Sequence, residues 1–210
     1  MGSIAEAICE AGRRLWQLGM VAANEGNISV RSAPERVICT PTGVSKGFMS
    51  PDEMAELSLD GELLNGKPVT SEVALHLEVY RVRPDINAVV HAHPVVATAY
   101  AISGQAPPLN ILAETALVFR DLPIAAYGTA GTREIVDAIA PHLPDHNAVL
   151  MQNHGALTLG ADLMEAYYRM EILEKFAKTA LAVAQLGSAE KIPYEKLAEL
   201  YAARQELGYE

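Results

Sequence analysis

The sequence predicts an α/β fold, a three-layer sandwich in which a mostly antiparallel central sheet carries helices on both faces. Short apolar runs that suit strands gather in the middle of the chain, and segments with helix caps or stops alternate with them. Several neighbouring strands are close enough in sequence to pair as hairpins. The 210 residues are 50% hydrophobic and contain no internal repeat or linker, so one domain over residues 1–210 is expected.

The helices are predicted from residues that cap or stop them. Ser3 and Glu6 have the spacing of a capping box, and Gly19 suits the end of the helix that they open. Pro84 stops a later helix, and the side chain of Asp162 suits the start of a long one. Together these signals predict helices over residues 4–18, 71–83, a short segment after Pro94, 133–140, 162–187 and 193–206.

The strands are predicted from short runs rich in β-branched and other apolar residues. Residues 27–31 alternate between apolar and polar side chains, whereas residues 148–152 form a continuous apolar run that suits a buried strand. Residues 42–50 contain two glycines and are expected to form a loop. The strand candidates are residues 27–31, 37–40, 86–93, 122–127, 148–152 and 156–159.

Three histidines indicate a metal site. His91 and His93 end an apolar strand candidate, and side chains two residues apart on a strand point to the same face. His154 follows Asn153 at an expected sharp bend. Three nitrogen ligands leave coordination positions open, as in a catalytic metal site, and zinc suits them best, with Mn²⁺, Co²⁺ or Fe²⁺ as alternatives. The other histidines are interpreted as surface or satisfied core residues: His76, His142 and His146.

Three short segments have the composition of an anion pocket. Each places a glycine or a small residue beside a side chain that forms hydrogen bonds, so that a ligand can approach backbone amides. The last segment also lies at a predicted helix start, where free N–H groups favour negative charge. Taken singly, each is more typical of an ordinary turn or helix cap. The candidate phosphate-binding residues are Gly26, Asn27, Thr42, Gly43, Thr70 and Ser71.

Glu72 directly follows the last of these segments and has two interpretations. In the first turn of a helix, a carboxylate can simply stabilise the helix dipole. Beside a Lewis-acidic metal, a carboxylate can instead act as the general acid and base that proton transfer next to a carbonyl requires. The sequence alone leaves both roles open for Glu72.

The charge balance excludes some classes of partner. The net charge is −10 and the isoelectric point is near 5.1. An acidic protein is a poor ligand for nucleic acid or for an anionic membrane surface. The first residues lack a signal-peptide pattern, and no apolar run approaches the roughly 18 residues of a membrane span. We therefore expect a cytoplasmic protein that acts on a small molecule.

Five motifs follow one another along the chain. They are Ala23-Asn24-Glu25-Gly26-Asn27-Ile28-Ser29, Thr40-Pro41-Thr42-Gly43, Ser71-Glu72, Val90-His91-Ala92-His93-Pro94 and Gln152-Asn153-His154-Gly155. Together and in this order they resemble the motifs of the class II aldolase/adducin-head family, and most closely its L-fuculose-1-phosphate aldolase-like sugar-phosphate aldolases. The resemblance extends from about Ile4 to Tyr209.

The resemblance implies roles for these residues. His91, His93 and His154 would be zinc ligands, and Glu72 would be the acid/base and a fourth, displaceable ligand. The six pocket residues would hold the phosphate of dihydroxyacetone phosphate. Family members are typically homotetramers with fourfold symmetry and active sites at subunit interfaces. A tyrosine near the C-terminus helps to close the site, and Tyr209 is the candidate here.

The implied reaction is metal-dependent, reversible cleavage of a ketose 1-phosphate to dihydroxyacetone phosphate and a small aldehyde. The substrate would be of the L-fuculose, 5-deoxyribulose or 5-methylthioribulose 1-phosphate type. Fuculose enzymes carry a tyrosine in the segment that corresponds to residues 110–115, where this chain has Glu114 instead. The second proton donor is therefore Glu114 or Tyr209, and the resemblance does not identify the aldehyde product.

Three alternatives share the fold. One is a pentulose-phosphate 4-epimerase, in which an aspartate typically stands at the position of Glu72, so that Glu72 favours the aldolase. The second is a methylthioribulose-1-phosphate dehydratase, which also has a three-histidine metal site. The third is a non-catalytic adducin-like binding module, against which the three histidines argue.

Overall fold

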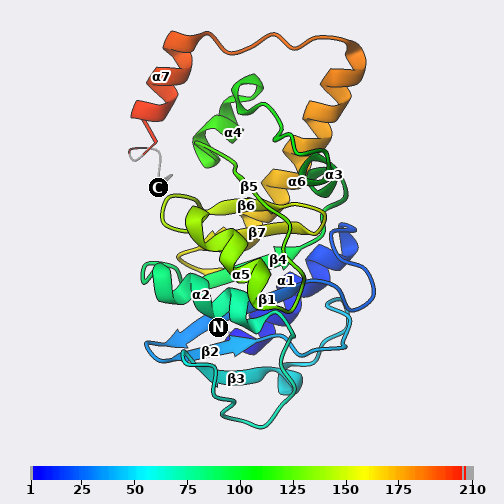
Figure 1. Cartoon of the computed structure of the whole chain (residues 1–210), viewed down its shortest axis with the longest axis vertical. Helices are drawn as coiled ribbons and strands as arrows, with labels where there is room; N and C mark the ends of the chain where they lie inside the picture. The colour runs from blue at the N-terminus through cyan, green and yellow to red at the C-terminus, as the bar shows by residue number, and fades with distance from the viewer. Residues whose placement is uncertain (1, 205, 207–210) are drawn as a thin grey trace.

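The computed structural model describes residues 2–204 and 206, and it has the predicted α/β sandwich (Figure 1). In this part of the chain seven strands form one sheet in the order β3-β2-β1-β4-β7-β6-β5. The strands are β1 (Asn27–Ala33), β2 (Arg36–Cys39), β3 (Ala55–Ser58), β4 (Ala88–Ala92), β5 (Ile124–Ala125), β6 (Ala148–Met151) and β7 (Gly155–Gly160). The helices are α1 (Ile4–Gln17), α2 (Val73–Val82), α3 (Val95–Ser103), α4 (Ala113–Val118), α5 (Arg133–Ile139), α6 (Leu163–Leu186) and α7 (Tyr194–Ala202).

The sheet is mixed and mostly antiparallel. Five of its six strand pairings are antiparallel, and only β5 runs parallel to its neighbour β6. Strand β4 lies in the middle of the sheet, between β1 and β7. In this register Asn27 of β1 lies directly opposite His91 of β4. The central strand therefore carries one of the predicted ligands into the best-buried part of the sheet.

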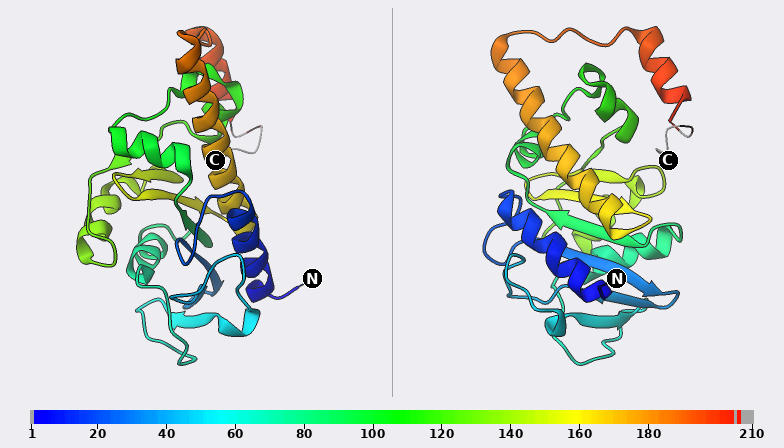
Figure 2. Two further views of the ribbon diagram at one scale, coloured as in Figure 1. Left: turned by 90° about the vertical axis from the view of Figure 1, so that its right-hand side faces the viewer. Right: turned by 180° about the vertical axis from the view of Figure 1, so that it is seen from behind.

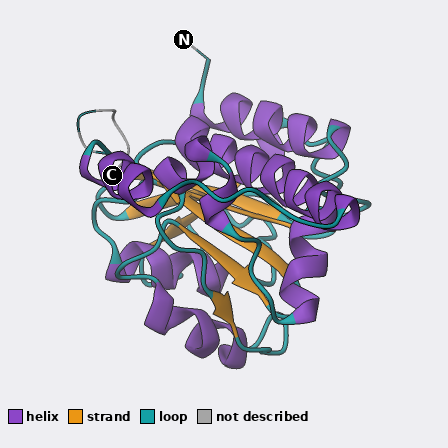
Figure 3. Ribbon diagram, turned by 90° about the horizontal axis from the view of Figure 1, so that it is seen from above, coloured by secondary structure: helices purple, strands orange, loops and turns teal. Residues whose placement is uncertain are grey.

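Helices cover both faces of the sheet, as the view from above shows (Figure 3). One face packs against α1, α3 and α6 through residues such as Ile8, Ala97 and Leu173. Seen from behind, α1 and α6 lie across this face (Figure 2). The other face packs against α2 and α5 through residues such as Val79 and Ile135. Both faces of the central strands are thus removed from water, which explains their continuous apolar runs.

Most sequence-predicted elements are confirmed, with several changed bounds. The capping box of Ser3 and Glu6 opens α1, and Asp162 caps α6. The helix predicted from Ser71 begins instead at Val73, so Glu72 stands at its N-cap position and makes no capping hydrogen bond. The strand predicted over residues 122–127 is only Ile124–Ala125. The last predicted helix is shorter, Tyr194–Ala202.

Among the described strands and α-helices, the sequence prediction missed two. Strand β3 is a short edge strand whose side chains alternate between buried and partly buried, a signal that a search for period-two patterns would have found. Helix α4 has only six residues and packs against α6 and α7. None of the described helices combines the length and the apolar character that crossing a bilayer requires.

Candidate metal centre

Strand β4 positions the first two histidines. His91 is the fourth residue of the strand and is fully buried, and His93 follows the strand directly. The Nδ1–H group of His91 donates to the carbonyl oxygen of Ala156, 3.0 Å away, because a carbonyl can only accept. This bond fixes the tautomer and leaves the lone pair of His91 on Nε2, as in many metal-bound histidines. Burial also holds the pKa of His91 well below its usual value, which keeps the ring neutral.

The turn between β6 and β7 positions the third histidine. Asn153 has a left-handed backbone, with φ of 56°, and the backbone N–H of His154 donates to the carbonyl of Met151. Gly155 follows, where an added Cβ would lie 2.5 Å from the carbonyl oxygen of Ala92 and 2.7 Å from the ring of His93. Only a glycine lets the two segments approach this closely.

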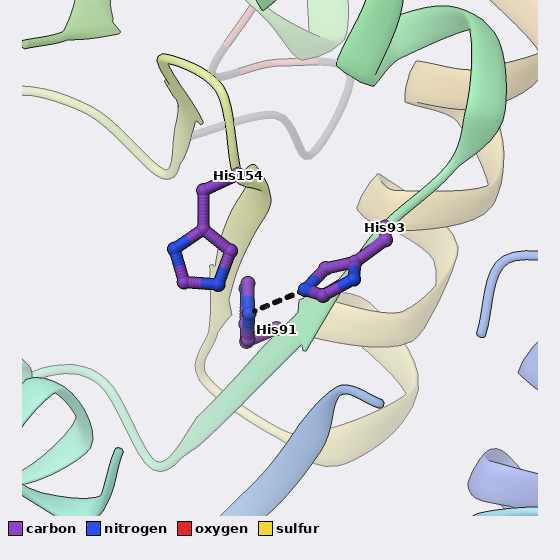
Figure 4. Close-up of side chains that lie close together, drawn as sticks. All are labelled: His91, His93 and His154. Carbon is purple, nitrogen blue, oxygen red and sulfur yellow. Dashed lines mark hydrogen bonds between the residues drawn. The ribbon is translucent and has the colours of Figure 1, made fainter. Parts of the chain in front are cut away.

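The three imidazoles converge on one point (Figure 4). Their ring centroids are 4.8 to 5.1 Å apart, and one nitrogen from each ring lies within 4.8 Å of the others. Nε2 of His93 lies 3.1 Å from Nε2 of His91, close to the separation of about 3.3 Å that two nitrogens on one tetrahedral zinc ion would have. Among the described residues this is the one group of three or more side chains that could share a metal ion.

Glu72 faces the same point. Its Oε2 lies 3.4 Å from Nε2 of His91, and its Oε1 lies 3.3 Å from Nε2 of His154. Oε1 is buried and accepts no hydrogen bond, which is costly for a carboxylate oxygen. A divalent cation among these nitrogens would satisfy it. The residues present therefore fit a metal ion with nitrogen and oxygen ligands, such as Zn²⁺, Mn²⁺, Co²⁺ or Fe²⁺.

The predicted phosphate-binding segments come together beside Glu72. Thr40 joins them, because its Oγ1 accepts from Ile28 N at 3.2 Å and its carbonyl accepts from Thr70 N at 3.3 Å. The Thr70 hydroxyl accepts from the backbone N–H of Glu72 at 3.4 Å. Two of the predicted residues have positive φ, Gly26 and Gly43. Thr42, Gly43 and Ser71 are exposed, whereas Gly26, Asn27 and Thr70 are buried.

The Asn27 side chain has a partner that the sequence did not reveal. Its Nδ2–H donates to Oε2 of Glu72 at 2.8 Å. Its Oδ1 meets Nε2 of His76. The Asn27 side chain is therefore engaged with the acid/base candidate, and its role in holding phosphate stays a prediction.

Lys46 is a buried cation that sequence reasoning missed, because a lysine in a glycine-containing loop normally reads as exposed. It is only 2% exposed. Its Nζ donates to the carbonyl oxygens of Asn24 at 3.1 Å and Val44 at 2.7 Å. The side chain thus ties the loop before β1 to the loop after β2, and these loops carry Gly26 and Gly43.

Replacing Lys46 with Met is expected to lower the free energy of unfolding by about 2 kcal/mol, because two partly buried carbonyl groups lose a charged donor. Urea denaturation of the purified variant measures this. The matched control is Lys175→Met, because Lys175 is exposed on α6 and should stay within about 0.5 kcal/mol of the parent. Equal stability of both variants would show that the hydrogen bonds of Lys46 do not stabilise the contact between the two loops.

His76 is confirmed as a satisfied core residue. It is fully buried on α2, and its Nδ1 lies 2.7 Å from the Ser29 hydroxyl. Burial and, to a smaller extent, the nearby His91 lower its pKa from 6.5 to about 3, although Glu72 partly opposes this shift. The ring is therefore neutral in the folded protein at any ordinary pH.

This low pKa predicts an acid-dependent loss of stability in the metal-free protein. Below pH 6.5 the unfolded chain binds a proton at His76 that the folded protein excludes until about pH 3, so stability falls as pH falls through this window. At pH 5 the loss from His76 is about 2 kcal/mol. Denaturation at pH 7.5 and pH 5 should show it, and His76→Gln should have a shallower pH dependence. The same slope in both proteins would contradict the assignment.

Those remaining sequence-predicted residues that the structure describes form no hydrogen bond or ion pair with the three histidines. Glu114 is exposed on α4, and within the described part of the chain no hydrogen bond or ion pair links it to the three histidines. Tyr209 lies outside the described residues. His142 and His146 are partly buried, contact each other and lie away from the cluster, with His146 Nε2 3.4 Å from Asp121. Their interpretation as surface or satisfied core residues stays a prediction.

Known proteins that are similar to this chain point to one family. The family model of the class II aldolase and adducin N-terminal domain matches residues 6–181. The chain is 36% identical over 169 residues to the L-fuculose phosphate aldolase of Methanocaldococcus jannaschii, covering 80% of this chain and 91% of that protein. It is 31% identical over 177 residues to the 3-oxo-tetronate 4-phosphate decarboxylase of Haemophilus influenzae, covering 82% of this chain and 84% of that protein.

A solved structure has the same fold over nearly its whole length. YgbL of Escherichia coli, a candidate aldolase, epimerase or decarboxylase, superimposes with a TM-score of 0.88 at 27% identity, covering 94% of this chain and 97% of that chain. The resemblance predicted from the motifs is confirmed by the family match and by these relatives. The chain belongs to the class II aldolase and adducin N-terminal domain family.

Proposed function

We propose that this protein is a metal-dependent aldehyde-lyase that reversibly cleaves a ketose 1-phosphate to dihydroxyacetone phosphate and a small aldehyde. The observation that carries the proposal is the buried carboxylate of Glu72, whose unpartnered Oε1 faces three converging imidazoles. A carboxylate in this place can exchange a proton with a substrate carbon beside the metal. The L-fuculose phosphate aldolase relative also supports it.

His91, His93 and His154 would hold the cation, with Glu72 as a displaceable fourth ligand. When bound, a divalent cation supplies Lewis-acid polarisation of the substrate carbonyl and offsets the charge that develops during bond cleavage. Zinc is our first choice, with Mn²⁺, Co²⁺ and Fe²⁺ as alternatives. The neutral state of His91, which its burial favours, keeps a lone pair available for this purpose.

The proposed steps use two proton-transfer groups. A base takes the proton of the C4 hydroxyl, the C3–C4 bond breaks, and its electrons move toward the polarised carbonyl. Glu72, which takes a proton from solvent when substrate displaces it, then gives that proton to C3, which completes dihydroxyacetone phosphate, and the base returns its proton to solvent. In the synthetic direction, Glu72 removes the same proton. Glu114 or Tyr209 is proposed as the second group, and backbone amides of the Gly26, Thr42 and Ser71 segments would hold the phosphate.

Decarboxylation is a second candidate, because one relative is a 3-oxo-tetronate 4-phosphate decarboxylase. Loss of CO₂ from such a 3-oxo acid leaves the same three-carbon fragment, and a proton on the same carbon again yields dihydroxyacetone phosphate. The two reactions differ in the leaving group, since CO₂ departs without a base to deprotonate a hydroxyl. Glu72 can serve both. The epimerase and dehydratase alternatives stay open as well.

A coupled assay distinguishes these reactions. Purified protein with zinc receives L-fuculose 1-phosphate, ribulose 1-phosphate, 5-methylthioribulose 1-phosphate and 3-oxo-tetronate 4-phosphate, and dihydroxyacetone phosphate is followed with glycerol-phosphate dehydrogenase. Chelator-sensitive release from a ketose phosphate supports aldol cleavage, and release from the 3-oxo acid alone supports decarboxylation. No release from any substrate, with metal bound, would favour epimerase or dehydratase chemistry. Failure to bind a metal would favour an adducin-like module.

The assembly is part of the proposal. We propose a homotetramer with fourfold symmetry and active sites at its subunit interfaces, as the family resemblance implies, in the cytoplasm. Light scattering coupled to size-exclusion chromatography measures the mass directly. A monomer of 22.5 kDa that retains full activity would contradict an interfacial site.

A further inference from the structure

A chain of buried polar side chains runs from the interior of the protein to Glu72. The Tyr80 hydroxyl lies 2.8 Å from the Ser29 hydroxyl, which lies 2.7 Å from Nδ1 of His76. Nε2 of His76 meets Oδ1 of Asn27, and Nδ2 of Asn27 lies 2.8 Å from Oε2 of Glu72. No member is more than 9% exposed. Buried polar networks of this kind are stabilising only when every member is satisfied.

Two periodic patterns bring these side chains together. Glu72, His76 and Tyr80 are spaced four residues apart, so they lie along one side of α2 and its N-cap. Asn27 and Ser29 are two residues apart on β1, so they point to one face of the sheet. Helix α2 covers that face, so the side chains of α2 and its N-cap meet those of β1 there. The metal ligand His91 lies opposite Asn27 in the sheet.

The chemistry of the groups fixes the direction of every bond. An ionised carboxylate can only accept, so the Asn27 amide donates to Glu72 through Nδ2 and presents Oδ1 to His76. Nε2 of His76 must then carry the hydrogen. Because the buried ring is neutral, Nδ1 holds the lone pair and accepts from the Ser29 hydroxyl. Ser29 in turn accepts from the Tyr80 hydroxyl. All donors point toward Glu72.

We propose that His76 is a positioning residue, which locks the Asn27 amide so that it holds Oε2 of Glu72 and leaves Oε1 to exchange the proton with substrate. A flipped Asn27 amide would set its NH₂ group against the N–H of His76 and its oxygen against the carboxylate. Both contacts are repulsive, so the chain permits one orientation. Oε1, which has no hydrogen-bond donor, lies on the side of His154. The inference rests on the proposed acid/base function of Glu72.

The first test reads the tautomer of His76 and needs no activity. Long-range ¹H–¹⁵N correlation spectra of the histidine-labelled full-length protein are recorded at pH 7.5, with and without zinc, and the His76 signals are assigned by their loss in His76→Gln. The proposed row of hydrogen bonds requires the neutral Nε2–H tautomer of His76 in both spectra. An Nδ1–H tautomer or a charged ring would overturn the inference, whatever reaction the enzyme catalyses.

The second test separates positioning from packing. His76→Leu removes the donor to Asn27 and should lower kcat by about tenfold to a hundredfold on the substrate found in the coupled assay, with KM and zinc content nearly unchanged. His76→Gln can place an amide N–H near the position of Nε2 and should recover most of the loss. If the Leu variant does not fold, the Gln variant and the spectra still decide the question: a Gln variant that loses as much kcat as Glu72→Gln would overturn it.

Tyr80→Phe is the matched control. Tyr80 is buried like His76. The substitution keeps the aromatic ring and removes only the hydroxyl group at the end of the hydrogen-bonded row. Its kcat should stay within about threefold of the parent, because the bonds from His76 to Glu72 remain. An equal loss in Tyr80→Phe and His76→Leu would mean that packing of the region sets kcat, and would overturn the inference. An inactive parent would instead refute the proposed function, while the tautomer result would stand on its own.

Discussion

Replacing Glu72 with Gln is expected to abolish exchange of hydrogen between water and dihydroxyacetone phosphate, and to lower kcat by about 10²- to 10⁴-fold. The amide has nearly the volume of the carboxylate and can still accept a hydrogen bond from Asn27. The fold and the hydrogen bonds that connect residue 72 to His76 through Asn27 should therefore persist. It can neither take a proton from C3 nor give one back. Exchange is measured with the purified variant in tritiated water.

The metal content of the Glu72→Gln variant provides the control. The three imidazoles are unchanged, so the variant should still bind one equivalent of zinc by elemental analysis, with at most a modest loss of affinity. Loss of the metal would make the activity result ambiguous, and Glu72→Asp would then show whether a displaced carboxylate restores exchange. Wild-type exchange in a zinc-loaded Gln variant would remove Glu72 from the acid/base role.

Replacing His154 with Ala is expected to lower the affinity for zinc by more than about a hundredfold and to eliminate activity at micromolar metal. Loss of an outer-shell partner alone typically costs 10- to 100-fold, so loss of a direct ligand should cost more. His154 lies in the turn after β6 and is partly exposed, so its removal leaves no large core cavity. Competition with a chelating dye measures the affinity.

His146→Ala is the matched control for this substitution. His146 is also a partly buried histidine, but it pairs with Asp121 and lies outside the cluster. Its variant should bind zinc as tightly as the parent and should retain activity. If His154→Ala binds one zinc with parental affinity, the metal is held elsewhere, and the site assignment is wrong. A chelator should remove activity from the parent, and added zinc should restore it.

Local sequence signals determined much of the architecture. Caps such as Ser3 and Asp162 marked helix starts, because their side chains satisfy N–H groups that a helix leaves free. The period-two spacing of His91 and His93 placed both rings on one face. These features depend on neighbours within a few residues, so they can be recognised without knowledge of the fold. The missed helix α4 and the truncated β5 carry weak local signals.

Contacts between distant segments were decided by the tertiary structure. The bond from Asn27 to Glu72 joins residues 45 positions apart, and that from His76 to Asn27 joins residues 49 apart. The burial of Lys46 likewise depends on two loops that meet only in the folded chain.

The physical reason is that periodicity shows which face of an element is buried but not which element covers it. The sequence by itself therefore determined most of the secondary structure around the site, the three histidines proposed as metal ligands and the family. Only the sheet register, which sets Asn27 opposite His91, and the packing of α2 on that face decided how Glu72 is oriented toward the metal centre.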